Sequence, residues 1–431
     1  MQLQSPPLPE TTHRKTTLAN GLRIISSPMP HVRSVAVSLY VGAGSRFETP
    51  QESGISHFIE HLCFKGTAKR PTAQAISEAI DGVGGILNAA TDREYTVYYA
   101  KVAQTHFELA VDVLADLVQA PLFDPEEMEK ERKVVLEELA SVADSPGQQV
   151  DLILDALIWP DQPLGWDIAG SEASVTGITR DMIIDYARRQ YVPNNMVVSV
   201  AGNVEHDDVV SMLEERLGIA IAGAPGSWFP AEEEQAEPRC SVLSKRTEQT
   251  HISMAVRAFP LSHPDRYALD LLSVLFGEGM SSRLFLELRE RQGLCYDVNS
   301  YVNHLLDTGS FGVYAAVDPR NAGQALDALL AELRRLREGI AEEELHKARE
   351  LAKGRMLLRL EDTRSVSGWL GGQEVLTGRI LSPEDIVERI EAVTTSDLNR
   401  VVDTLLRPER LSLAVVGPHR SERPFQSRLK L

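Results

Sequence analysis

The chain has 431 residues, of which 43% are hydrophobic and 25% are charged, a composition typical of a globular protein with more than one domain. Its formal net charge of −18 argues against non-specific binding to nucleic acid. No apolar run is long enough to cross a bilayer, and the polar start of the chain (residues 1–15) resembles neither a secretory signal nor a transit peptide. The three cysteines, Cys63, Cys240 and Cys295, are widely spaced, which indicates a reducing compartment without a disulfide framework.

Strands and helices are predicted in mixed order along the first part of the chain. The Asn20-Gly21 pair inside residues 16–26 predicts a β-hairpin, and residues 34–42 alternate in polarity as a half-buried strand does. Asp124 is positioned to cap a strongly charged helix. The further elements that we expect are helices at 72–80, 107–118 and 126–142 and a strand at 94–101.

A helix over residues 54–64 carries the sequence His57-Phe-Ile-Glu60-His61. Residues four apart share one face of an α-helix, so both imidazoles can point at the same atom, with the Glu60 carboxylate at the edge of that face. Two imidazole nitrogens and a neighbouring carboxylate are the groups that a catalytic zinc site uses, and His-x-x-Glu-His is a metallopeptidase signature. The alternative is a surface helix that carries two histidines by chance.

The second half of the chain repeats the order of the first. Helices are predicted at 148–160 and 179–190 and a strand at 196–202, after which residues 220–240 lose periodicity and gather Gly, Pro and acidic residues as a linker does. The repeated elements are expected at 251–259, 265–276, 309–317, 322–336 and 341–360. We therefore predict an α+β fold made of a duplicated unit, with homologous domains at 1–219 and 241–431 joined by the linker. Only the first copy has the two histidines.

The motif in its setting, His57 to Thr67, strongly resembles the pitrilysin (insulinase-like) metallopeptidases. The resemblance is greatest to the branch that contains the mitochondrial processing peptidase β-subunit and its short bacterial relatives. It runs through most of the chain and includes residues 87–91, 97–101, 131–138, 163–165, 191–196, 281–284 and 288–296.

This resemblance implies roles for further residues. The family takes its third zinc ligand from a glutamate on a later helix, where the candidates are Glu137 and Glu138, and the match of the surrounding sequence selects Glu138. Glu131 shares a stripe of that helix with Glu138 and matches a carboxylate that orients the site.

Two other sets of residues match positions through which the family contacts its substrate. Arg289 and Tyr296 of the second domain match a pair that contacts the substrate backbone and the oxyanion, roles that suit a fixed cation and a neutral donor. Asn88 and Ala89 lie where the family offers a strand edge to an extended peptide.

The resemblance implies a zinc-dependent endopeptidase of peptides or unfolded protein segments, with Zn²⁺ as cofactor and Glu60 as the base that activates water. It also implies that the two α/β-sandwich domains are half of a four-domain clamshell. Because one chain carries both the zinc residues and the Arg/Tyr pair, we expect a homodimer. The expected compartment is the cytoplasm of a bacterium, with the mitochondrial matrix as the alternative.

Three alternative functions belong to other classes. A catalytic subunit of a presequence-processing heterodimer would need a paralogous partner. A non-catalytic scaffold similar to the respiratory-complex core subunits would share the fold, although such subunits typically lose part of the zinc set that this chain keeps. A protein that binds zinc only for structure would not depend on Glu60.

Overall fold

A computed structural model describes residues 13–232 and 235–431 of the protein. Residues 1–12, which contain most of the segment used for the targeting prediction, and residues 233–234 of the predicted linker lie outside the described residues. The chain forms two compact α+β units, as the duplication predicts. Among the described helices, none has both the length and the apolar composition that a membrane span requires.

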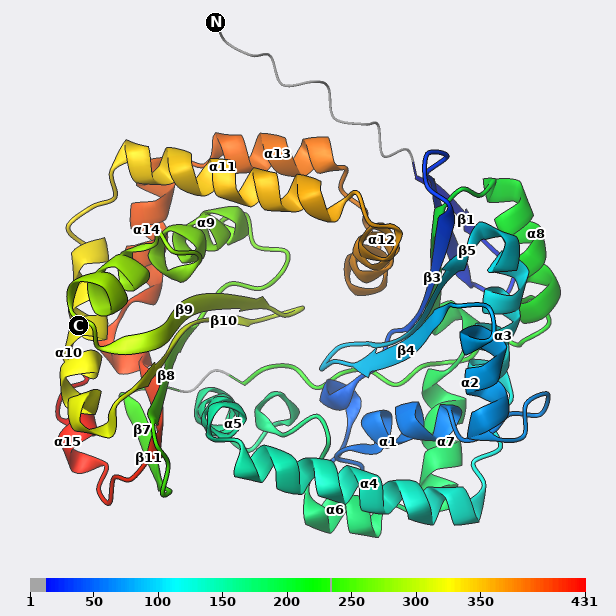
Figure 1. Ribbon diagram of the computed structural model, residues 1–431, viewed down its shortest axis with the longest axis horizontal. Helices are drawn as coiled ribbons and strands as arrows, with labels where there is room; N and C mark the ends of the chain where they lie inside the picture. Colours follow the sequence, from blue (N-terminus) through cyan, green and yellow to red (C-terminus); the bar gives the residue numbers. More distant parts are fainter. Residues whose placement is uncertain (1–12, 233–234) are drawn as a thin grey trace, which may run out of the picture. The chain divides into compact units, whose positions relative to one another are not determined.

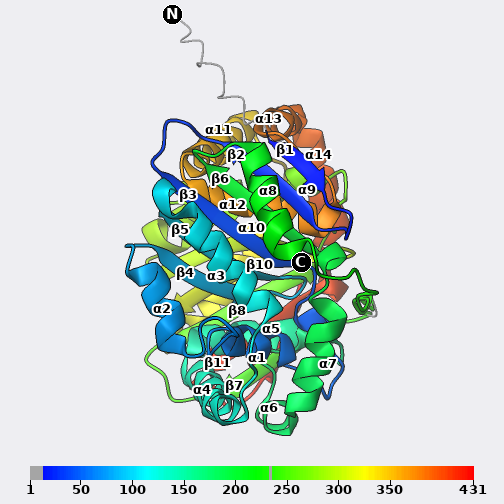
Figure 2. The same cartoon turned by 90° about the vertical axis from the view of Figure 1, so that its right-hand side faces the viewer.

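The first unit is built on a six-stranded sheet in the order β1-β2-β6-β3-β5-β4. Helix α12 lies on one face of this sheet, and α3 and α8 lie on the other (Figure 1); in Figure 2, α3 and α8 are in front of it. Because both faces are covered, β3 and β6 are buried along nearly their whole length. The strands are β1 (Arg14–Thr17), β2 (Arg23–Pro28), β3 (Ser34–Val41), β4 (Ile86–Thr91), β5 (Thr96–Ala103) and β6 (Met196–Gly202), and the helices are α3 (Phe107–Gln119), α8 (His206–Leu217) and α12 (Thr363–Thr377).

The second unit contains a five-stranded sheet in the order β7-β11-β8-β10-β9. Its strands are β7 (Arg239–Ser244), β8 (Thr250–Arg257), β9 (Cys295–His304), β10 (Gly309–Val317) and β11 (Ser412–Gly417). This order repeats β2-β6-β3-β5-β4, and the pairs β2–β6 and β7–β11 are both parallel while their other neighbours are antiparallel. The topology therefore confirms the predicted duplication.

The remaining helices lie between and after these strands. They are α1 (Ile55–Cys63), α2 (Ala73–Asp81), α4 (Pro125–Asp144), α5 (Pro146–Ile158), α6 (Glu172–Gly177), α7 (Arg180–Gln190), α9 (Arg266–Gly277), α10 (Ala322–Leu336), α11 (Glu342–Arg359), α13 (Pro383–Ala392), α14 (Thr395–Leu405) and α15 (Arg423–Gln426). The predicted helix at 265–276 is observed as α9, in the place that α1 occupies in the first copy.

Each unit contains one helix from the other half of the sequence. Helix α12 packs Val366 and Leu370 against the first sheet, where Tyr40 Oη donates to the Gly368 carbonyl at 3.0 Å. Helix α5 packs against β8 and β11 of the second sheet. The units therefore consist of residues 1–137, 167–229 and 357–386, and of residues 138–166, 230–356 and 387–431. They are interleaved in sequence, which differs from the expected division at 220–240, and β7 begins inside that predicted linker.

The start of α1 is fixed by a buried acidic side chain. Gly54 precedes the helix with a φ of 91°, and a Cβ atom there would lie 2.5 Å from the Ala169 carbonyl oxygen. The fully buried Glu48 carboxylate accepts hydrogen bonds from the backbone N–H groups of Gly54 at 2.7 Å and Ser56 at 2.9 Å. These N–H groups have no partner within the helix, so Glu48 caps it and sets the position of everything that α1 carries.

Replacement of Glu48 by Ala should destabilise the protein by roughly 2–4 kcal/mol, because two buried N–H groups lose their acceptor. Chemical or thermal unfolding measures this loss. Glu78→Ala, on the exposed face of α2, is the control and should change the free energy of unfolding by less than about 0.5 kcal/mol. Equal stability of the two variants would contradict the capping role.

Candidate metal centre

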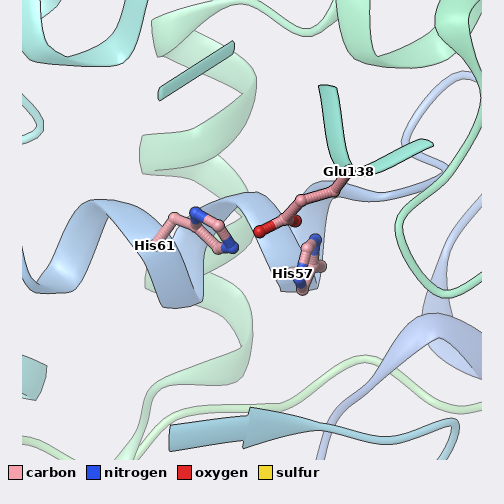
Figure 3. A group of neighbouring side chains, drawn as sticks. All are labelled: His57, His61 and Glu138. Carbon is pink, nitrogen blue, oxygen red and sulfur yellow. The ribbon is translucent and has the colours of Figure 1, made fainter. Parts of the chain in front are cut away.

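His57, His61 and Glu138 form a group in which one ligand atom from each residue lies within 4.8 Å of the others. The two imidazole rings of α1 have centroids 4.6 Å apart and an interplanar angle of 68°. Figure 3 shows the Glu138 carboxylate pointing toward the space between these rings. Two nitrogen donors and one carboxylate are a donor set that suits Zn²⁺.

The half-buried face of α1 carries His57 and His61, and the opposite face is apolar. Ile55, Phe58, Ile59 and Leu62 are completely or almost completely buried, whereas His57, Glu60 and His61 are only partly covered. The helical period therefore separates a face that packs into the unit from a face that presents ionisable groups.

Helix α4 carries Glu138 and is anchored on the first unit by its earlier turns. Asp124 caps it, since its Oδ1 accepts from the backbone N–H groups of Glu126 at 2.9 Å and Glu127 at 3.1 Å. Arg132 donates to the Ile178 carbonyl at 2.9 Å, and its guanidinium carbon lies 5.4 Å from the centroid of the Phe58 ring on α1. Because α4 continues as one helix through residue 144, these anchors also position Glu138.

Glu131 links the two helices at the centre. This buried residue, 5% exposed, has Oε2 at 3.1 Å from His61 Nδ1 and Oε1 at 2.8 Å from Lys65 Nζ. A His61 tautomer whose Nδ1–H donates to Glu131 presents Nε2 as an unprotonated ligand atom. Lys65 neutralises the charge of the buried carboxylate; sequence reasoning did not assign it a role, although it lies inside the stretch that carries the family resemblance.

Burial shifts the pKa of two ionisable side chains on α1. Burial, together with the neighbouring His61, lowers the pKa of His57 to about 4, so its ring is neutral at neutral pH. Cys63 is two residues from His61, and burial raises the pKa of its thiol to about 12, although a hydrogen bond from Tyr98 opposes this rise. This thiol is completely buried and lies outside the group of three.

Glu60 lies on the same face of α1 and is outside the group of three. It is half-buried, and its Oε2 accepts a hydrogen bond of 2.5 Å from Thr91 Oγ1 at the end of β4. Sequence reasoning selected Glu60 through the motif but gave Thr91 no role, because the two residues belong to different elements.

Asn88 and Ala89 lie on β4, the last strand of the first sheet. Opposite them on β5 are Tyr99 and Tyr98, respectively. Asn88 is exposed and its Oδ1 accepts from the N–H of Ala89 at 2.8 Å. Among the described strands β4 pairs only with β5, so its outer edge offers backbone groups to a further strand.

Arg289 and Tyr296 form a separate pair in the second unit. Arg289 lies in the helical segment 285–291, donates to the Tyr296 carbonyl at 2.9 Å, and places its guanidinium carbon 4.6 Å from the centroid of the Tyr296 ring. The Tyr296 residue is 76% exposed.

The second copy differs from the first at the helix that corresponds to α1. This helix, α9, is buried along an almost continuous apolar run. Among the described residues, the single potential metal-binding group is the one in the first copy.

Comparison with known families matches both halves of the chain. Residues 23–172 match the family described as insulinase (peptidase family M16), and residues 177–351 match the family described as the peptidase M16 inactive domain. Together these matches include residues of both copies of the duplicated unit.

Relatives with similar lengths are named zinc proteases. An uncharacterized zinc protease of Streptomyces coelicolor is 38% identical over 94% of this chain and 90% of its own. Uncharacterized zinc proteases of Mycobacterium tuberculosis (38% identical; 97% of this chain and 96% of the relative) and Bacillus subtilis (35%; 94% and 98%) are also similar.

Solved structures share the fold over the same length. A protease from Helicobacter pylori has a TM-score of 0.89 and 26% identity over 95% of this chain and all of its own. A chain of complex III2 from Candida albicans, with a TM-score of 0.84, 21% identity and coverage of 97% and 100%, is similar in fold alone.

Substitution of Glu138 by Gln should weaken zinc binding by at least about tenfold, because the group loses its anionic ligand. Glu137→Gln is the matched control: this exposed neighbour on α4 is outside the group of three, so its loss should leave affinity unchanged. Competition with a chelator measures the zinc affinity of both variants. A stronger effect at Glu137 than at Glu138 would reverse the assignment of the third ligand.

Proposed function

The chain belongs to the insulinase family of peptidases, family M16, and we propose that it is a zinc-dependent endopeptidase that cleaves peptides or unfolded protein segments. The observation that carries the proposal is the convergence of His57, His61 and Glu138, with Glu60 on the same face of α1. The names of the bacterial relatives support the same chemistry.

His57, His61 and Glu138 would hold the ion. When bound, zinc supplies Lewis acidity that lowers the pKa of a water molecule toward about 7 and polarises a carbonyl group. The protein prepares these ligands: burial keeps the His57 imidazole neutral, and Glu131 orients His61 through Nδ1. Lys65 in turn holds Glu131 in place.

Glu60 would act as the general base. Its carboxylate takes a proton from the attacking water and returns it to the nitrogen of the leaving amine. A glutamate adjacent to His61 and three residues from His57 lies at the edge of the ligand face, where it can reach a water molecule held at that face.

An extended substrate would bind along β4. Its outer edge at Asn88 and Ala89 pairs with no other described strand, and a peptide that adds there as a strand must itself be unfolded. Arg289 and Tyr296 would supply donors to the substrate backbone and to the negative charge that develops on the scissile carbonyl oxygen. This accounts for a preference for peptides and unfolded segments over folded proteins.

We further propose that two copies of the chain form the working enzyme. One chain contains two α+β units, which is half of the number in the four-domain clamshell that the family resemblance implies. The same chain contains both the zinc group and the Arg289/Tyr296 pair. A homodimer is therefore sufficient, and a paralogous partner is not needed. The fold similarity to a complex III2 chain keeps the scaffold alternative open, but the retention of His57, His61 and Glu138 favours an enzyme.

Chelation and a base variant together test the proposed reaction. Wild-type protein should cleave an unstructured peptide, lose this activity with a chelator, and regain it when zinc is restored. Glu60→Gln should lose on the order of 10²- to 10⁴-fold in kcat with unchanged zinc content, because only the proton acceptor is removed. Glu78→Gln, exposed on α2, is the control for the loss of a glutamate charge. Activity of Glu60→Gln equal to wild type would refute the role of Glu60.

Light scattering on the purified chain should give twice the mass of one chain, in a preparation that is active without any second polypeptide. A mass of one chain in an active preparation would refute the homodimer. A preparation that becomes active only after mixing with a paralogous subunit would instead establish the heterodimer.

A further inference from the structure

We propose that Thr91 is a positioning residue that fixes the Glu60 carboxylate for proton transfer; this rests on the proposed role of Glu60 as the base. Thr91 Oγ1 donates to Glu60 Oε2 at 2.5 Å, which is at the short end of the range for a hydroxyl donating to a carboxylate. Both residues belong to the first unit, but they are on different elements: Glu60 is on α1 and Thr91 ends β4.

The backbone on either side of Thr91 is held firmly. Thr91 pairs with the buried Thr96 across the β4–β5 hairpin, and Thr96 Oγ1 donates to the Ala43 carbonyl at 3.0 Å. The tight turn between the strands is closed by the N–H of Asp92, which donates to the Tyr95 carbonyl at 2.8 Å. The hydroxyl that meets Glu60 is therefore attached to a strand end with little freedom to shift.

The loop that contains Gly44 and Arg46 holds this turn from outside the hairpin. The N–H of Arg46 donates to the Arg93 carbonyl at 2.8 Å, and the buried Arg46 guanidinium forms an ion pair of 2.6 Å with Glu94. Gly44 passes so close that a Cβ atom would lie 2.0 Å from the Asp92 carbonyl oxygen, so only glycine permits this approach. This loop resists movement of the strand end toward or away from α1.

A rigid donor matters because a glutamate side chain has three rotatable bonds. A hydrogen bond from a fixed hydroxyl selects one carboxylate orientation before substrate arrives, and so reduces the entropy lost on reaching the transition state. Misplacement of a catalytic group by even 1 Å lowers the rate, which is why such groups need support from neighbouring side chains. Thr91 supplies this support from the strand that is proposed to bind the substrate.

A purely structural role makes a different prediction. If the Thr91 hydroxyl only ties β4 to α1, its loss would lower stability and disturb the metal ligands of α1, and zinc affinity would fall together with activity. If it positions Glu60, its loss lowers kcat while zinc affinity and KM remain.

The test compares Thr91→Val, which keeps the shape and removes the hydroxyl, with Thr91→Ser, which keeps the hydroxyl. Thr91→Val should lose on the order of tenfold in kcat, with KM changed by less than about twofold, and Thr91→Ser should retain most of the wild-type rate. Zinc affinity by chelator competition and the midpoint of thermal unfolding are measured for each variant. The zinc affinity and the unfolding midpoint of each variant should stay close to the wild-type values.

The matched control is Thr49→Val, because Thr49 Oγ1 also donates to a glutamate carboxylate, Glu52 Oε2 at 3.0 Å, away from the metal group. Its kcat should equal that of wild type. An active wild type with an equally active Thr91→Val variant would overturn the Thr91 inference alone, as would equal losses in Thr91→Val and Thr91→Ser or a loss explained by weaker zinc binding. An inactive wild type would overturn the proposed function itself.

Discussion

The hydrogen bond between Glu131 and His61 is the interaction on which the site depends most. It joins α4 to α1 at 3.1 Å, and the same carboxylate is held by Lys65 at 2.8 Å. One buried side chain therefore fixes the distance between two helices and the ring nitrogen that His61 presents. Glu138 lies about two turns further along the same stripe of α4, so the contact made by Glu131 also helps to position the third residue of the metal group.

The two copies share a sheet topology but differ in the helix that corresponds to α1. Both sheets have the same strand order, and each is covered by a helix from the other half of the sequence, α12 on the first and α5 on the second. In the second copy α9 has filled the corresponding face with apolar residues and is almost completely buried. A helix used entirely for packing has no partly covered face left for ionisable groups, so the architecture is kept in both copies although only the first has the metal group.

The sequence predicted well what is local and poorly what depends on tertiary contacts. The Asn20-Gly21 hairpin, the motif helix and the strand at 309–317 follow from residue period and turn chemistry, and all are observed. Strand β9 was missed, and an amphipathic pattern could show that α5 has a buried face but not that this face covers the second sheet. Lys65 and Thr91 were missed for the same reason: their partners are distant in sequence, and no spacing rule connects them.

Strand β4 links recognition to chemistry in the proposed enzyme. Its outer edge at Asn88 and Ala89 would set the register of an extended substrate, while Thr91, two residues further, holds the base. Both functions thus share one rigid element, and the loop around Gly44 fixes the end of that element. A substrate that pairs with β4 would therefore be held by the same strand that orients Glu60. A folded segment cannot pair with this edge, so the proposed binding mode would select unfolded substrates.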